Sequence, residues 1–371
     1  MRVLYGVNGE GMGHATRSQV VINSLLGREH DVRVVASGAA FNYLKDRLPR
    51  VDEIMGPSFA MEEGEIRRWA TVRQNLTLGP KQMPETVRHW LGVVDEWQPD
   101  AVITDFEPLA GLYARLSKTP LVCVDNIHMI DRCKHDKEII GAEHADFAMA
   151  RAVTRAMVPT AGDYLVLTFF DAPIVRGRTT LIAPIVRPEI EAAEVVDGDH
   201  LVVYSSGDPQ LIEALRSSGM RCLVYGMRGG PAEDTVDGNL EFRPRSNEGF
   251  VEDLRTARAV VAGGGFSLLS EAVYMGKPTL AVPLHGQFEQ LMNARYLERD
   301  RFGMCATEVT AEVLSTFIGR LDEFDEALGQ YKQDGNSATL QTIEETAATA
   351  ASQDRRTRRK LRRTARRRVK K

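Results

Sequence analysis

The stretch AGGGFSLLSEA, residues 262–272, decides the fold that the sequence predicts. An apolar strand pattern at 259–262 precedes it, and a turn at Gly276 leads to a second apolar run at 278–282. This order of strand, glycine turn, helix, turn and strand is typical of a parallel βα unit. A helix that opens on glycines presents free N–H groups and its positive dipole end, so the turn could bind a diphosphate.

A second glycine-rich turn follows the first strand pattern of the chain, residues 1–7. It reads GVNGEGMGH, residues 6–14, and a helix is expected after it from about Thr16 to Leu26. The G-x-G-x-x-G spacing of a dinucleotide loop does not fit, because Asn8 stands where the second glycine belongs. The second strand pattern, 31–36, also lacks the acidic residue that such a motif carries at its end. The pattern favours another kind of ligand-binding turn, with a purely structural turn as the alternative.

Strand and helix patterns alternate on both sides of a proline-rich break, APIVRP at 183–188. This alternation predicts an α/β fold of two facing Rossmann-like domains, each with a parallel sheet, and a cleft between them. The expected boundaries are 1–182 for the N-terminal domain, 183–198 for the interdomain linker, 199–346 for the C-terminal domain and 347–371 for a basic tail. The tail is expected to be disordered or a lone basic helix.

The net charge of −4 averages two unlike parts of the 371-residue chain. Residues 354–371 hold twelve Lys or Arg and one Asp, so this tail carries +11. The remaining 35 basic and 50 acidic residues give the rest of the chain −15. An acidic body disfavours nucleic acid as a partner of the folded domains.

The sequence predicts no membrane span, leader or metal centre. No apolar run reaches roughly 18 residues, and the first residues lack the pattern of a signal peptide. We therefore expect a cytoplasmic protein. The four cysteines form no C-x-x-C pair, which favours reduced thiols. Asp-Gly-Asp at 197–199 matches the D-x-D pattern of metal-dependent transferases, but we interpret it as a turn and expect no metal and no cofactor.

Together, the two glycine turns resemble those of GT-B glycosyltransferases of the family-28 type, which includes the lipid-linked N-acetylglucosamine transferase of peptidoglycan synthesis. The resemblance covers most of residues 1–330 and is most specific at 262–295. It implies an inverting hexosyltransferase that takes its sugar from a nucleotide-sugar, with uracil as the base by analogy. The N-terminal domain would then hold the acceptor and the C-terminal domain the donor.

The resemblance places the donor against the C-terminal domain. The glycine turn would take the diphosphate, Glu271 the ribose, and the Glu289-Gln290 pair the transferred sugar. The full set expected at the donor is Ser206, Gly207, Arg243, Gly263, Gly264, Gly265, Phe266, Ser267, Glu271, His285, Glu289 and Gln290. Arg243 could equally be a solvated surface charge.

The catalytic base is expected in the N-terminal domain. His14 is the leading candidate because an imidazole titrates near neutral pH, and Glu10 and Asp105 are the alternatives. The acceptor-side set is Gly11, Gly13, Glu107, Asn126 and His128. The polar groups at 105–108 and 125–128 each follow a strand pattern, and helix capping or turn chemistry is their alternative interpretation.

Two other functions suit the same architecture, because a fold does not fix a function. A nucleotide-sugar 2-epimerase needs an acid and a base that flank the sugar and no acceptor cleft. A non-catalytic nucleotide-sugar sensor needs only the donor site. The glycine-rich residues 9–14 and the Glu289-Gln290 pair favour transfer over epimerisation, and the presence of Glu271, Gln290 and His14 argues against a sensor.

The basic tail, residues 355–371, has two interpretations. It could bind an anionic membrane surface, which would hold the enzyme on the inner membrane face beside a lipid-linked acceptor. It could also remain solvated. The sequence does not identify the acceptor.

Overall fold

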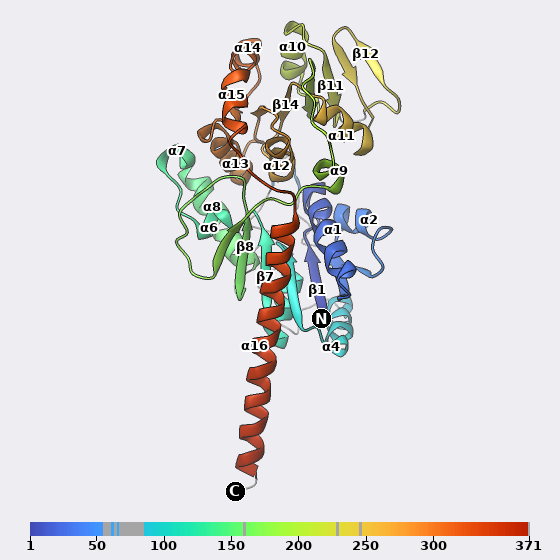
Figure 1. Cartoon of the computed structure of the whole chain (residues 1–371), viewed down its shortest axis with the longest axis vertical. Helices are drawn as coiled ribbons and strands as arrows, with labels where there is room; N and C mark the ends of the chain where they lie inside the picture. The colour runs from blue at the N-terminus through green and yellow to red at the C-terminus, as the bar shows by residue number, and fades with distance from the viewer. Residues whose placement is uncertain are drawn as a thin grey trace.

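Two domains, each built around one large sheet, are stacked end to end (Figure 1). The structure, a computed structural model, describes residues 1–54, 61–62, 65–66, 85–158, 161–227, 230–244 and 247–369. Each domain is built on a seven-stranded sheet, in the orders β3-β2-β1-β6-β7-β8-β9 and β12-β13-β11-β10-β14-β15-β16. The predicted α/β class with two Rossmann-like domains is confirmed.

The first sheet is parallel throughout. Its strands β1, β6, β7 and β8 are buried, as in a sheet with helices on both faces. Parallel strands end at one edge, so Val7, Asp105 and Asp125, the last residues of β1, β6 and β7, lie along the same edge. The elements of this domain are β1 Arg2–Val7, α1 Met12–Gly27, β2 Asp31–Ala36, α2 Gly38–Leu44, β3 Val51–Glu53, β4 Met61–Glu62, β5 Glu65–Ile66, α4 Glu85–Trp97, β6 Ala101–Asp105, α5 Pro108–Ser117, β7 Leu121–Asp125, α6 Met129–Arg132, α7 Lys137–Ile140, α8 His144–Met157, β8 Asp163–Leu167 and β9 Thr179–Ile182.

The second sheet repeats this plan, except that β12 pairs antiparallel with β13. The strand patterns at 259–262 and 278–282 form β14 and β15, as predicted. The elements are α9 Pro188–Glu191, β10 Leu201–Tyr204, α10 Pro209–Ser217, β11 Cys222–Tyr225, β12 Thr235–Asp237, β13 Leu240–Phe242, α11 Asn247–Arg255, β14 Ala259–Ala262, α12 Phe266–Tyr274, β15 Thr279–Ala281, α13 Phe288–Arg299, β16 Gly303–Cys305, α14 Ala311–Gly319 and α15 Leu321–Leu328.

The two domains touch through aromatic rings that stack across the boundary. Phe169 stacks on Phe266 with ring centroids 5.8 Å apart, and Phe170 stacks on Tyr296 at 3.8 Å. Arg295 of α13 donates hydrogen bonds to the carbonyls of Ile139 and Ile140 at 3.0 and 2.8 Å. These contacts bring α12 and α13 of the second domain against the carboxyl edge of the first sheet.

The last helix, α16 Ser337–Val369, returns to the first domain and then continues beyond it (Figure 1). The side chains of Ile343, Ala347 and Ala351 are buried in the hydrophobic core that contains the first sheet. Glu344 accepts a hydrogen bond from His30 at 2.8 Å. The sequence analysis divided this segment at 346 between a domain and a tail. The structure has one helix instead, because apolar residues every three to four positions give it one buried face.

No helix in the described part of the chain combines the length and the apolar character needed to cross a membrane.

Candidate functional site

A histidine–aspartate pair lies where the first sheet ends. Gly11 adopts φ 76° and ψ 158° before α1 begins, a conformation that glycine takes without strain. The turn places His14 in the first turn of α1, where its Nδ1 lies 2.8 Å from Oδ1 of Asp105. Asp105 closes β6 and is 1% exposed. A buried carboxylate bonded to one ring nitrogen fixes the ring and leaves the other nitrogen, Nε2, for chemistry.

Arg17 pairs with the same carboxylate and was not predicted from the sequence. Its Nε and Nη2 donate to Oδ2 and Oδ1 of Asp105 at 2.7 and 2.6 Å, and Nη2 also lies 2.7 Å from Nδ1 of His14. Burial alone would raise the pKa of Asp105, but the charges of Arg17 and His14 outweigh it and lower the pKa to about 2. Asp105 is therefore ionised at neutral pH and too weak a base to take a hydroxyl proton. Its position supports a role in orienting His14.

Residue 17 could have been found from helix geometry. Positions 14 and 17 are three residues apart and lie on one face of a helix. A buried arginine on that face needs an acidic partner, and Asp105 was already a candidate. Glu10, the other alternative base, lies in the exposed turn before α1, where its backbone N–H donates to Oδ1 of Asn8 at 2.8 Å.

The two glycine turns predicted from the sequence face each other. A Cβ added to Gly13 would lie 2.4 Å from Oγ of Ser267 in the first turn of α12. Glycine at this position therefore lets the two helix starts approach closely. Glu289, in the first turn of α13, completes the group: burial raises its pKa, and the charges of His14 and Arg17 oppose that rise. The predicted base and the predicted sugar-binding carboxylate are thus electrostatic neighbours.

The turn at 263–265 packs on α13. A Cβ added to Gly264 would lie 2.2 Å from the backbone oxygen of Gln290, whereas one added to Gly263 would meet Oε1 of Gln290 at an ordinary 3.6 Å. The Gln290 amide bonds to Oε1 of Gln287 at 2.6 Å and to the backbone N–H of Leu284 at 3.1 Å. Gln290 and the glycine turn are therefore neighbours, and Phe266 opens α12 directly after the turn.

We expect Gly264→Ala to lower the free energy of unfolding by about 1–3 kcal/mol, the usual cost of overpacking. The new methyl group must push the backbone of α13 away. Gly263→Ala is the matched control and should change stability much less, because its methyl group meets no backbone atom at short range. Urea unfolding of both variants measures the difference, and equal stabilities would contradict the packing described here.

Glu271 is already engaged by a linker residue. Both of its oxygens accept hydrogen bonds from Arg187, at 2.7 Å from Nε and 2.7 Å from Nη2. Glu271 is 5% exposed and lies one helical turn beyond Ser267. The fork occupies the facing lone pair of each oxygen, which a ribose diol would also use, so the expected contact of Glu271 with a ribose stays a prediction.

The other donor candidates lie in loops around the carboxyl edge of the second sheet. Ser206 and Gly207 follow β10, and Gly207 has φ 97°. His285 is exposed in the loop after β15. Arg243 is half-buried and bonds to Glu241 at 3.1 Å and to Asp234. The expectation that Arg243 lies beside a base stays a prediction.

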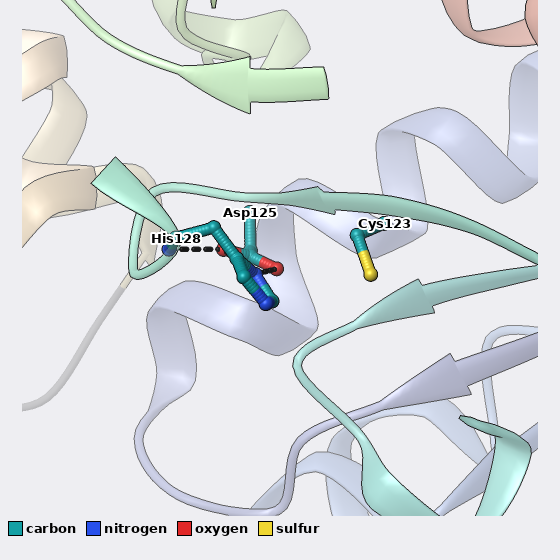
Figure 2. A group of neighbouring side chains, drawn as sticks. All are labelled: Cys123, Asp125 and His128. Atoms are coloured by element: carbon teal, nitrogen blue, oxygen red, sulfur yellow. Dashed lines mark hydrogen bonds and ion pairs between the residues drawn. The ribbon is translucent and has the colours of Figure 1, made fainter. Parts of the chain in front are cut away.

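On the acceptor side, a second histidine–aspartate pair follows β7 (Figure 2). Nδ1 of His128 lies 2.8 Å from Oδ2 of Asp125, and the side chains of both residues are buried. Asn126 donates to the carbonyl of Leu167 at 3.0 Å. Nε2 of His128 and Oδ1 of Asn126 are buried and have no hydrogen-bond partner among the residues that the structure describes. Such atoms carry a cost that a ligand hydroxyl could remove.

Glu107 has a structural explanation. Its two oxygens accept the backbone N–H groups of Leu109 and Ala110 at 2.8 and 2.6 Å, which caps α5. Burial raises the pKa of the Glu107 carboxyl to about 7, although the two backbone hydrogen bonds act to lower it. The capping interpretation, left open above, accounts for this side chain, and a contact with an acceptor stays a prediction.

One group of side chains in the described residues could hold a metal ion: Cys123, Asp125 and His128, whose ligand atoms lie within 4.8 Å of one another (Figure 2). Burial raises the pKa of the Cys123 thiol well above its usual value, which disfavours the thiolate that a metal requires. Asp125 also accepts the ring nitrogen of His128 already. These three side chains are therefore better suited to hydrogen bonding than to metal binding.

Comparison with known proteins adds the family to this geometry. A family model described as glycosyl transferase family 1 matches residues 1–322. An uncharacterized glycosyltransferase of Methanosarcina acetivorans is 26% identical over 362 residues, which cover 88% of this chain and 91% of that protein.

Solved glycosyltransferase structures share the fold. The glycotransferase of kitacinnamycin superposes with a TM-score of 0.67 at 15% identity, over 93% of this chain and 99% of that one. MurG of Acinetobacter baumannii gives 0.58 at 13% identity, over 93% and 99%. The resemblance to GT-B glycosyltransferases inferred from the glycine turns is confirmed.

Proposed function

Because the chain belongs to glycosyl transferase family 1, we propose that this glycosyltransferase moves a hexosyl group from a nucleotide-sugar, a UDP-sugar by resemblance, to an acceptor hydroxyl, with inversion and without a metal ion. One observation carries the proposal. Gly13, which precedes His14 in the first domain, packs on Ser267 in the first turn of α12. The proposed base of one domain therefore lies close to the proposed phosphate-binding turn of the other.

The reaction that suits this geometry is a single displacement. The acceptor hydroxyl gives its proton to Nε2 of His14 while its oxygen bonds to the anomeric carbon. The bond from that carbon to the diphosphate oxygen breaks, and the electron pair leaves with the nucleoside diphosphate. Free N–H groups and the positive end of α12 stabilise the leaving charge. Asp105, held ionised by Arg17, stabilises the imidazolium that forms.

The acceptor substrate is proposed to direct hydroxyl groups, which donate hydrogen bonds, toward the carboxyl edge of the first sheet. Oδ1 of Asn126 accepts hydrogen bonds, and Nε2 of His128 does so when Nδ1 carries the proton toward Asp125. Within the described part of the chain, neither atom has a hydrogen-bond partner. A sugar ring or another polyol offers hydroxyl groups that suit two acceptors at adjacent positions.

Proton NMR of each nucleotide-sugar, incubated with the enzyme with and without a crude membrane extract, separates the three candidate functions. Transfer consumes the donor only with extract and produces a glycoside of opposite anomeric configuration. An epimerase converts the donor to its epimer without extract. A sensor broadens the donor signals and changes nothing else. Either of the last two results would overturn the proposal.

The basic end of α16 is proposed to contact an anionic membrane surface. The tail carries +11, and clusters of Lys and Arg bind such surfaces at roughly 1 kcal/mol per residue near the surface. Helix α16 runs past the amino ends of the first sheet, away from the edge that carries His14 (Figure 1). The tail would therefore hold the enzyme by the side opposite the edge that carries His14.

Deletion of residues 355–371 should abolish co-sedimentation with vesicles that contain phosphatidylserine and leave turnover on a soluble acceptor unchanged. The tail adds charge far from the site, which is why the two readouts should separate. Vesicles of phosphatidylcholine alone are the control. Equal binding to anionic vesicles with and without the tail would refute this role.

A further inference from the structure

The carboxylate of Asp105 receives two different partners from α1. Arg17 forms a two-point fork with it, from Nε to Oδ2 at 2.7 Å and from Nη2 to Oδ1 at 2.6 Å. The ring of His14 approaches the same Oδ1, at 2.8 Å from Nδ1. The side chains of Arg17 and Asp105 are 7% and 1% exposed, so their charges face each other largely without water. Because a guanidinium keeps its proton in proteins, the carboxylate has a permanent counter-charge.

The guanidinium of Arg17 also lies directly against the ring of His14. Nη2 of Arg17 is 2.7 Å from Nδ1 of His14, and both nitrogens reach the same oxygen of Asp105. A protonated ring would place a second positive charge beside the guanidinium, and a neighbouring like charge disfavours the charged form of a group. The arrangement therefore favours a neutral ring.

The other titratable groups near this cluster come from β1, β7 and α13. Tyr5 of β1 is neutral, since burial raises the pKa of its hydroxyl. Asp125 of β7 is bound to the histidine of its own pair. Burial raises the pKa of the Glu289 carboxyl on α13, although the positive charge of His14 would lower it. Among the described residues, Asp105 is the carboxylate that bonds to the ring of His14.

We propose that Arg17 is a positioning residue that keeps the ring of His14 neutral in the resting enzyme, so that Nε2 can accept the proton of the acceptor hydroxyl. The inference rests on the proposed function, which makes His14 the base. A buried carboxylate requires a positive partner, and Arg17 supplies one. Without Arg17, the described partner of Asp105 that can become positive is His14. The proton that the ring then takes from water would fill the position that the reaction needs.

NMR of protein labelled with ¹³C and ¹⁵N in its histidine rings tests this without a substrate, because the ring shifts report both charge and tautomer. The resonance of His14 is identified by its loss in His14→Gln. In the wild-type protein, the ring should be neutral at about pH 7.5 with its proton on Nδ1. In Arg17→Gln, the pH at which the ring loses its charge should rise by about 1–3 units, the usual effect of one nearby charge. Arg17→Lys keeps the charge and should remain close to the wild type.

The same two variants give an activity readout that a purely structural role would not move. Turnover of Arg17→Gln should fall at neutral pH and recover as the pH rises toward about 9, because loss of the extra proton restores the base. Arg17→Lys should keep most of its turnover at neutral pH. Damage to the structure would instead lower turnover at every pH.

A matched control is available in the same domain. Arg33 forms a two-point fork with Asp52, at 2.6 and 3.2 Å. Arg33→Gln should leave the titration of His14 unchanged, and melting temperatures identify any variant that does not fold. Asp105→Asn gives a second measurement in the opposite sense. The ring would then face Arg17 without the carboxylate, so it should lose its charge at a lower pH than in the wild type.

The outcomes separate the two proposals. A wild-type protein without transfer activity overturns the proposed function, and the NMR titration still decides whether Arg17 keeps the ring neutral. A neutral ring with its proton on Nε2 overturns the role of His14 as the base. An unchanged titration in folded Arg17→Gln overturns the inference alone. Equal titrations of Arg17→Lys and Arg17→Gln do the same, as does an upward shift in Asp105→Asn.

Discussion

His14→Ala is expected to lower turnover by about 10²–10⁴-fold, the usual contribution of a general base, while nucleotide-sugar affinity stays the same. The side chain meets the acceptor proton in the proposed reaction and makes no proposed contact with the donor. Asp105 and Arg17 would remain paired with each other in the variant, so the local structure should persist. Steady-state kinetics with donor titration measures both quantities.

Two further variants sharpen this result. His14→Gln keeps a polar side chain without a titrating ring and should be as slow as the alanine variant. Glu10→Gln is the control for the alternative base and should remain active. Full turnover in both His14 variants would show that His14 is not the catalytic base. A slow Glu10→Gln variant would indicate that Glu10 is the base instead.

Glu271→Ala should both weaken binding of the nucleotide-sugar donor and lower the free energy of unfolding. Loss of hydrogen bonds to a charged group predicts about 10–100-fold weaker binding of the nucleotide. The change also leaves Arg187 largely buried without its acidic partner, and breaking a buried pair in this way typically costs about 3–5 kcal/mol. Nucleotide titration and urea unfolding of the same variant measure the two effects.

A double variant distinguishes the loss of the pair from the loss of the carboxylate. Arg187→Met combined with Glu271→Ala removes both charges and should recover part of the lost stability, without recovering nucleotide affinity. Glu252→Ala breaks the exposed pair with Arg255 and should change stability little, because surface pairs contribute little. A Glu271→Ala protein with wild-type stability would contradict the burial of this pair.

The fold could be predicted because its decisive features are local. Strand, glycine turn and helix follow one another at 1–27 and at 259–274, and these runs form the centre of each sheet. The carboxyl edge of a parallel sheet then fixes where the polar residues that follow each strand must lie. For that reason, the sequence could indicate both His14 and Asp105 as candidate catalytic residues at this edge.

Helix spacing could have placed Arg17 on the same face as His14, but local patterns do not show which acid either arginine binds. Arg17 and Asp105 are 88 residues apart in sequence, and Arg187 and Glu271 are 84 apart. Nothing in the sequence near either arginine indicates which acid it meets. The small apolar residues of α16 likewise indicate a buried face but not which domain covers it.

The segment Asp105-Phe106-Glu107-Pro108 was ambiguous in another way. Asp105 and Glu107 both lie at the end of β6, and the sequence did not show that their side chains have different partners. The structure turns Asp105 to His14 and Glu107 to the first turn of α5. A positive φ of 55° at Phe106 separates the two. Backbone dihedrals of this kind are not visible in a residue pattern.

The central claim is metal-independent transfer from a nucleotide-sugar, and release of nucleoside diphosphate tests it most directly. A panel of nucleotide-sugars is incubated with the enzyme, with and without a crude membrane extract as acceptor source, each in the presence and absence of EDTA. The account predicts release from one donor that depends on the extract and survives EDTA. Release that EDTA abolishes, or no extract-dependent release from any donor, would contradict it.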